Sequence, residues 1–269
     1  MSTIISKDQL GNEIEISFPP KRIISLVPSQ TEFLFDIGLE EEVIGVTRFC
    51  IYPKVIVKAK EKIGGTKQFD LEKIKLLQPD LIIGNKEENY LEGIEELQKH
   101  FPVWMSDIFT LQDSYAMMNE ISRITNREEE GQKIISEIQT SFKQFQITSN
   151  NFKQRTAAYF IWRKPYMVAA NNTFINHLLK ILGVRNVFES VERYPEIKQE
   201  KLAELKPDFI FLSSEPYSFS EKHFEEFQNL SPQSKVVIVN GEMFSWYGSR
   251  LKFAAEYFGK LRQQIGITG

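Results

Sequence analysis

One segment of this 269-residue chain occurs twice, and a constant offset of 128 residues separates the two copies. The first copy contains PDLIIGNKEENY at Pro79–Tyr90, and the second contains PDFIFLSSEPYS at Pro207–Ser218. Seven residues are identical at this offset: Glu72, Lys73, Leu77, Pro79, Asp80, Ile82 and Glu87 recur at Glu200, Lys201, Leu205, Pro207, Asp208, Ile210 and Glu215. A constant offset indicates one structural unit used twice. Two copies are too few for a solenoid, so the repeat predicts a pair of similar lobes.

The composition is that of a globular protein, with 42% hydrophobic and 26% charged residues. The net charge of -3 and the pI near 5.8 provide no basic field of the kind that nucleic acids or anionic membranes require. We therefore expect neither partner.

Membrane insertion and export signals are not expected from the sequence. No run approaches the roughly 20 apolar residues that span a bilayer, and MSTIISKDQLGNEIEI lacks a basic region followed by an apolar one. The single cysteine, Cys50, excludes an intramolecular disulfide and a multi-cysteine metal site. A cytoplasmic protein beginning at a native Met1 fits these features, and so does an exported protein whose signal was removed.

Strand and helix signals alternate along both halves. Ile23–Val27 is β-rich and stops at Pro28, after which Ser29 and Glu32 have the spacing of a helix capping box. Asp70 stands where the N-cap of the repeated helix belongs. Alternation of this kind predicts an α/β fold with parallel sheets.

The segment between the copies has a different character. Leu111 to about Phe145 contains no proline and has apolar residues at helical spacing, which predicts one long helix or two shorter ones. We therefore expect an N-terminal α/β lobe (1–108), a linking backbone helix (109–149) and a C-terminal α/β lobe (150–269), with a ligand cleft between the lobes.

Candidate ligand-binding residues are those that follow predicted strands, because loops at the carboxyl ends of parallel strands line binding sites. Ring faces and guanidinium groups suit a large, flat or anionic small molecule. The alternative is that the rings complete the core of their own lobe, although three rings in the polar loop FSWYGSR favour a function. The candidates are Ser29, Gln30, Phe49, Tyr52, Lys67, Glu87, Trp162, Arg163, Tyr166, Arg193, Tyr194, Glu215, Tyr217, Trp246, Tyr247 and Arg250.

Two pairs of repeated glutamates have two interpretations each. Glu87 and Glu215 could accept hydrogen bonds from a ligand or bind a metal, or they could be solvated charges paired with residues such as Lys86. Glu72 and Glu200 belong to first helical turns, where carboxylates stabilise the helix dipole. Their matched positions also suggest one partner that contacts both lobes.

Several motifs resemble those of periplasmic binding proteins with a helical backbone, the group that includes cobalamin- and ferric-siderophore-binding partners of ABC importers. They include PPKRIISLVPSQTEFLFDIG, IGGTKQFDLEKIKLLQPDLIIGNKEEN, WRKPYMV, RYPEIKQEKLAELKPD, SSEPYSF and NGEMFSWYGSR, which together cover nearly the whole chain; the later ones resemble a subgroup described as helical backbone metal receptors. The resemblance implies two α/β lobes joined by a rigid helix. It also implies ligand binding between the lobes, docking of Glu72 and Glu200 onto arginines of a permease, and a corrin-facing ring at Tyr194.

Taken together, we expect a monomeric, non-enzymatic solute-binding protein of an ABC importer with a metal-chelate ligand: a corrinoid, a ferric siderophore or a haem-like molecule. No cofactor of its own is expected, although the ligand itself would carry iron or cobalt. Two alternatives stay open, a cytosolic carrier without a transporter and an enzyme that uses Glu87 and Glu215. A bare metal ion is not expected, because the histidines, His100, His177 and His223, are scattered over predicted helices.

Overall fold

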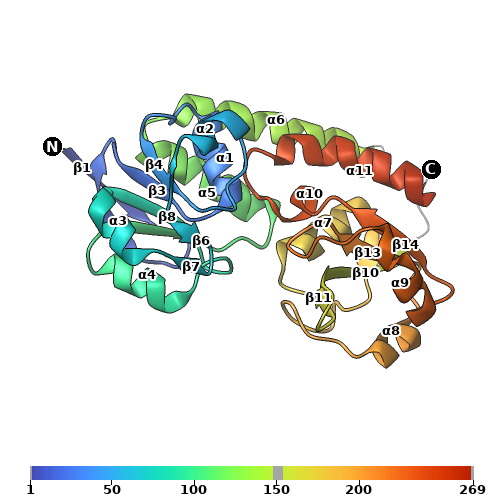
Figure 1. Ribbon diagram of the computed structural model, residues 1–269. Helices are drawn as coiled ribbons and strands as arrows, with labels where there is room; N and C mark the ends of the chain where they lie inside the picture. The colour runs from blue at the N-terminus through green and yellow to red at the C-terminus, as the bar shows by residue number, and fades with distance from the viewer. Residues whose placement is uncertain (1, 148–153, 268–269) are drawn as a thin grey trace. The chain divides into compact units, whose positions relative to one another are not determined.

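The computed structural model describes residues 2–147 and 154–267, which divide into two compact units (Figure 1). Unit 1 consists of Met1–Ile108, Gln112–Gln139 and Tyr247–Lys252. Unit 2 consists of Phe109–Leu111, Thr140–Trp246 and Phe253–Gly269. The chain therefore passes between the units several times, three of them within a helix.

Unit 1 is built on a five-stranded sheet in the order β5-β4-β3-β8-β9, in which every neighbouring pair is parallel. A β1–β2 hairpin and a β6–β7 hairpin accompany the sheet. The strands are β1 (Ser2–Lys7), β2 (Glu13–Phe18), β3 (Ile23–Ser25), β4 (Val43–Val46), β5 (Glu61–Lys62), β6 (Gly64–Gly65), β7 (Gln68–Phe69), β8 (Leu81–Asn85) and β9 (Val103–Ser106). The helices are α1 (Pro28–Asp36), α2 (Lys54–Lys58), α3 (Leu71–Leu77), α4 (Leu91–Gln98), most of α5 (Leu111–Ile124) and the first part of α6 (Glu128–Ile147).

Unit 2 is built on a second five-stranded sheet, in the order β11-β10-β13-β14 with β12 paired to β10. Its pairs are parallel except for β10 with β11. The strands are β10 (Arg155–Trp162), β11 (Met167–Ala169), β12 (Val184–Asn186), β13 (Phe209–Ser213) and β14 (Lys235–Val239). The helical elements are α7 (Phe174–Leu182), α8 (Gln199–Leu205), the 3-10 helix η1 (Glu221–His223), α9 (Phe224–Leu230), α10 (Glu242–Ser245) and most of α11 (Leu251–Ile265).

The central strands are fully buried, as expected for parallel sheets covered on both faces. In unit 1, Ile24 and Ile82 have no exposed surface. In unit 2, Phe160, Ile210 and Phe227 belong to one buried cluster. The predicted α/β class with parallel sheets is therefore confirmed.

The sequence repeat is a structural repeat. Helix α8 begins and ends 128 residues after α3, and β13 begins and ends 128 residues after β8. Gln78 and Lys206, which follow the two helices, share a left-handed backbone with φ of 47°. The two copies therefore have the same local fold.

The repeated aspartates fix neighbouring strands. Asp80 accepts hydrogen bonds from the backbone N–H groups of Lys21 (2.7 Å) and Arg22 (2.8 Å), immediately before β3. Asp208 accepts from the backbone N–H of Thr156 (2.8 Å), at the start of β10. In both units, the Pro-Asp pair thus joins one parallel strand to the next.

The start of α3 follows its sequence signal, and the start of α1 does not. Asp70 accepts a hydrogen bond from the backbone N–H of Lys73 (3.0 Å) and caps α3 as predicted. The predicted capping box of Ser29 and Glu32 is wrong, because α1 begins at Pro28 and its N-cap, Val27, makes no side-chain cap bond. Proline suits the first helical position, since it lacks the N–H that would be left without a partner there.

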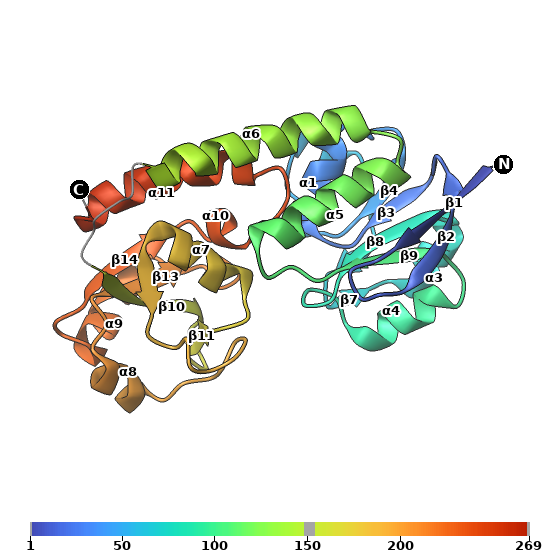
Figure 2. The ribbon, with the colours of Figure 1, turned by 180° about the vertical axis from the view of Figure 1, so that it is seen from behind.

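Of the two predicted alternatives for residues 111–145, the structure has two helices. Asn126, with φ of 58°, lies in the turn between α5 and α6. Figure 2 shows these helices side by side. A Cβ on Gly131 of α6 would lie 1.9 Å from Ser122 Oγ of α5, so glycine permits the close approach.

Candidate functional site

The loop that follows β8 is held by side-chain amides. The Asn85 Oδ1 atom accepts hydrogen bonds from the backbone N–H groups of Glu87 (2.8 Å) and Glu88 (3.1 Å). Asn89 accepts from the backbone N–H of Asn85 (2.8 Å) and donates to the carbonyl of Thr66 (3.1 Å). The loop thereby presents two carboxylates at the carboxyl end of a central strand.

Other unit 1 candidates differ in accessibility. Exposed Lys67 donates a hydrogen bond to the backbone carbonyl of Glu87, so it belongs to the same loop cluster. Phe49 is 51% exposed, with the Arg48 guanidinium 5.4 Å from its ring centroid. Ser29 and Gln30 are buried on α1. The structure thus leaves Phe49 and Lys67 as surface groups and places the two α1 residues in the interior.

Arg250 forms a buried, two-pronged ion pair with Glu32. The guanidinium donates from Nε (2.8 Å) and from Nη2 (2.6 Å) to the two carboxylate oxygens, and lies 3.8 Å from the ring centroid of Tyr52. Burial raises the pKa of Glu32, while the hydrogen bond from Arg250 lowers it and the net direction is upward. Arg250 and Tyr52, both predicted to bind ligand, are therefore engaged within unit 1.

The aromatic rings of FSWYGSR are buried and hydrogen-bonded. Trp246 is 6% exposed and donates from its indole N–H to Glu215 (2.9 Å), which also accepts from Ser245 (2.6 Å), all within unit 2. Tyr247 is 5% exposed and donates to Glu88 of unit 1 (2.9 Å), and burial is the main reason that its pKa is raised. These contacts give both rings and Glu215 a structural role.

Unit 2 has an aromatic pair, one exposed ring and one half-buried ring, near its strand ends. Trp162, the last residue of β10, is 40% exposed, and its indole N–H donates to the carbonyl of Lys164 (3.1 Å). The edge of one ring meets the face of the other in the Trp162–Tyr217 pair, with centroids 5.6 Å apart. Tyr217 lies in the loop after β13 and is half-buried. Its hydroxyl oxygen is 3.3 Å from the Nε2 atom of His223. Trp162 therefore keeps exposed ring surface at the end of β10, while Tyr217 packs partly against the core of unit 2.

Glu226 of α9 engages the two polar candidates that follow Trp162. Arg163 donates to it from Nε (2.9 Å) and Nη2 (2.7 Å), and the Tyr166 hydroxyl donates to its other oxygen (2.5 Å). Burial, followed by the hydrogen bond to Glu226, raises the pKa of Tyr166 to about 12. Sequence reasoning missed Glu226, because it lies on a helix face 60 or more residues away with no distinguishing motif.

Arg193 and Tyr194 lie together in the loop before α8. Arg193 has φ of 64°, donates to the carbonyl of Asn172 (3.0 Å), and places its guanidinium 5.2 Å from the Phe109 ring centroid. Tyr194 is half-buried. Both side chains therefore keep accessible surface in unit 2.

The repeated glutamates of the first helical turns lie on the surface. Glu72 is in α3, where its side chain is 83% exposed, and Glu200 is an exposed residue of α8. Their helices match residue for residue at the repeat offset, so the two carboxylates occupy equivalent places in the two units.

A protein-built metal site is not found among residues 2–147 and 154–267, which contain no group of three or more His, Cys, Asp or Glu side chains that could hold an ion. Over the same ranges, the helices are too short or too polar to cross a membrane.

The comparisons with known proteins point in one direction. The periplasmic binding protein family matches residues 23–227. A vitamin B12-binding protein of Pectobacterium carotovorum is 26% identical over 242 residues, which cover 88% of this chain and 86% of the relative. An uncharacterised ABC transporter substrate-binding lipoprotein of Bacillus subtilis is 25% identical over 211 residues, or 76% of this chain and 67% of the relative. The crystal structure of the periplasmic vitamin B12-binding protein of Vibrio cholerae aligns with a TM-score of 0.81 at 23% identity, covering 93% of this chain and 99% of that one.

Proposed function

This chain belongs to the periplasmic binding protein family, and we propose that it is the solute-binding protein of an ABC-type importer for a metal-chelate ligand. A corrinoid is the first candidate, and ferric siderophores and haem are the other members of the class. The observation that carries the proposal is the alignment with a vitamin B12-binding protein over 88% of this chain. Enzymatic activity is not part of the proposal.

Within unit 2, we propose that Trp162 and Tyr217 contact the planar part of the ligand, with Tyr194 and Arg193 as further contacts. Ring faces give wide contact areas at low conformational entropy, and guanidinium groups pair with the carboxylates or amide oxygens that metal chelates carry. The exposure of Trp162 supports this choice, because its indole ring can be reached from solvent at the end of a strand.

Within unit 1, we propose Phe49, Lys67 and Glu87 as ligand contacts. Phe49 offers an exposed ring, and Lys67 and Glu87 offer opposite charges from one loop cluster. Four other candidates are buried in the described structure, and we propose that they hold neighbouring groups in place and do not contact the ligand: Gln30, Trp246, Tyr247 and Arg250.

For the importer, we propose that Glu72 and Glu200 dock onto cationic groups of the permease. Their exposure and their equivalent places in the repeat support this role. The domain division that accompanies the proposal is an N-terminal lobe (1–108), a linking helical segment (109–149) and a C-terminal lobe (150–269).

Tryptophan fluorescence tests the ligand class. Titration with hydroxocobalamin, haemin or a ferric hydroxamate should change the emission of the wild-type protein, and Trp162→Phe should lose most of that change. Calorimetry on the same samples gives the affinity without optical interference from the coloured ligands. Trp104→Phe is the matched control. Trp104 is buried in unit 1, so its replacement should leave the change in emission on ligand binding unaltered.

The ligand class is wrong if none of the three compounds binds by calorimetry. The importer role is tested in cells: deletion of the gene should abolish uptake of the ligand, and a Glu72→Gln/Glu200→Gln double variant should fail to restore uptake while it binds ligand normally. Restored uptake would remove the docking role and leave ligand binding intact.

A further inference from the structure

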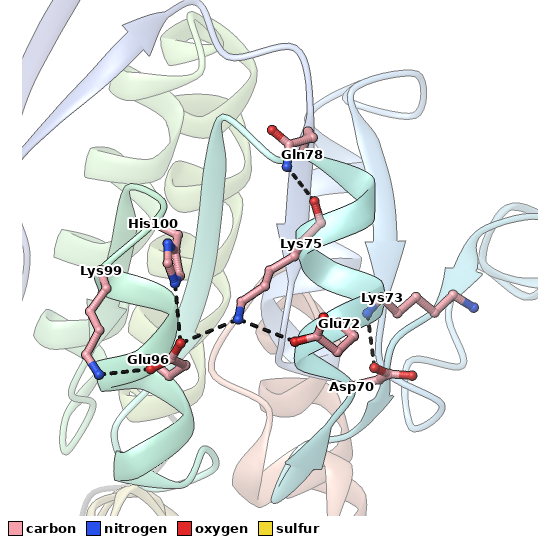
Figure 3. Close-up of polar contacts among 8 residues, drawn as sticks. All are labelled: Asp70, Glu72, Lys73, Lys75, Gln78, Glu96, Lys99 and His100. Carbon is pink, nitrogen blue, oxygen red and sulfur yellow. Dashed lines mark hydrogen bonds and ion pairs between the residues drawn. The ribbon is translucent and has the colours of Figure 1, made fainter.

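Glu72 shares its nearest cation with a second carboxylate on the neighbouring helix (Figure 3). The Lys75 ammonium lies 3.4 Å from Glu72 and 3.5 Å from Glu96 of α4. Glu96 also contacts Lys99 at 2.9 Å and His100 at 3.3 Å. The charge on Glu72 is therefore partly compensated by a surface network of α3 and α4.

The central carboxylate of this network is ionised at neutral pH. The hydrogen bond from Lys99, followed by that from His100, lowers the pKa of Glu96 to about 2. At neutral pH, Glu96 is therefore a second anionic partner for Lys75, at nearly the same distance as Glu72.

The same network cannot form around Glu200. At the repeat offset, Ala203 replaces Lys75 and Phe224 replaces Glu96. The nearby Lys201 contacts Glu204 instead, at 3.1 Å. Within the described ranges, the Glu200 side chain has no ion pair or hydrogen bond, and Lys198 before it makes no cap bond to the helix.

From this difference, and resting on the proposed docking role, we infer that the matched carboxylates are unequal docking groups: Glu200 presents an open charge, whereas Lys75 partly neutralises Glu72. A cationic partner surface therefore depends more on Glu200. Glu96 is a positioning residue in this scheme, since it draws Lys75 partly away from Glu72.

The expected difference is small but measurable. Exposed ion pairs of this kind alter binding constants by about twofold, and salt reduces the effect. A cation that approaches Glu72 must compete with Lys75, whereas one that approaches Glu200 has no such competitor within ion-pair distance in the described structure.

A site-resolved titration measures this directly. A synthetic peptide with four arginines separated by glycines is added to the intact protein at low ionic strength, and backbone amide shifts are followed by NMR. We expect the amides of α8 to reach half-saturation at about half the peptide concentration that the amides of α3 require. Lys75→Met should lower the peptide concentration at half-saturation of the α3 amides to that of the α8 amides. Glu96→Gln should raise this concentration for α3, because Lys75 then pairs with Glu72 alone.

Glu256→Gln is the control, since Glu256 is an exposed carboxylate of α11 paired with Lys260 and should leave both helices unchanged. The inference would be overturned if the α3 and α8 amides reached half-saturation at the same peptide concentration. It would also be overturned if Lys75→Met left the half-saturation concentration of α3 unchanged. Failure of the docking proposal gives a different result, normal uptake by the Glu72→Gln/Glu200→Gln variant. The amide spectrum of each variant also shows whether it is folded.

Discussion

Replacing Arg250 with methionine should destabilise unit 1 strongly. The Arg250 and Glu32 side chains are 10% and 9% exposed, and both hydrogen bonds between them are short. Removing one partner of a buried ion pair leaves the other charge without compensation, which costs about 3–5 kcal/mol of unfolding free energy. Replacing both partners with methionine should recover most of that loss, because no charge is then buried.

The pH dependence provides an internal check. Burial already raises the pKa of Glu32 above its ordinary value of 4.5 in the folded protein, and loss of Arg250 should raise it further. A carboxyl whose folded pKa exceeds its unfolded pKa contributes stability below the unfolded pKa and loses it as pH rises through the folded value. Arg250→Met should therefore be less damaging at pH 5 than at pH 8.

Urea unfolding is the assay, with Trp104 as the reporter of unit 1. All proteins compared carry Trp162→Phe and Trp246→Phe, so that fluorescence comes from Trp104 alone, which is 1% exposed in the folded state. Equal losses at pH 5 and pH 8, or a double variant as unstable as Arg250→Met, would refute the buried-charge reasoning.

Three further predictions concern single contacts. Asp208→Asn should lower unfolding free energy by about 1–2 kcal/mol in unit 2, because it weakens the bonds from Thr156 and Arg155, and urea unfolding of Asp80→Asn should show a similar loss in unit 1. Gly131→Ala should reduce the melting temperature by several degrees because its Cβ meets Ser122, and Ser122→Gly should restore part of the loss in a calorimetric scan; no recovery would mean that the contact is not limiting. Arg262→Met should lower unfolding free energy by about 1–3 kcal/mol, read from unit 2 tryptophans, because Arg262 donates to the carbonyls of Leu182 and Ile181 at the end of α7; an unchanged midpoint would contradict this role.

Local signals predicted much of the fold. The N-cap Asp70 and the repeated Pro-Asp pair act within a few residues or at a regular offset, so sequence patterns reveal them. The predicted capping box is wrong because α1 begins one residue earlier, at Pro28, so that Ser29 lies inside the helix. Glu32 instead pairs with Arg250, 218 residues away, and local spacing contains no information about such a contact.

The candidate site was less predictable for the same reason. A ring in a polar loop has two explanations. Trp246 and Tyr247 are buried, and each donates a hydrogen bond to a carboxylate that the sequence does not connect to it. Trp162 and Arg163 are adjacent in the chain, yet one is exposed and the other is held by Glu226. The exposure of a side chain at a strand end depends on which helix or loop covers that end, and the hydrophobic periodicity of the sequence contains no information about this.

The return of Tyr247–Lys252 to unit 1 bears on synthesis and on protein engineering. Arg250, the ion-pair partner of Glu32, is synthesised 218 residues after Glu32. Until then, the carboxylate of Glu32 lacks the cation that compensates its charge in folded unit 1. A fragment that ends after α5 should thus be a poor folder, and adding the peptide 247–252 in trans or by fusion is the rational way to repair it.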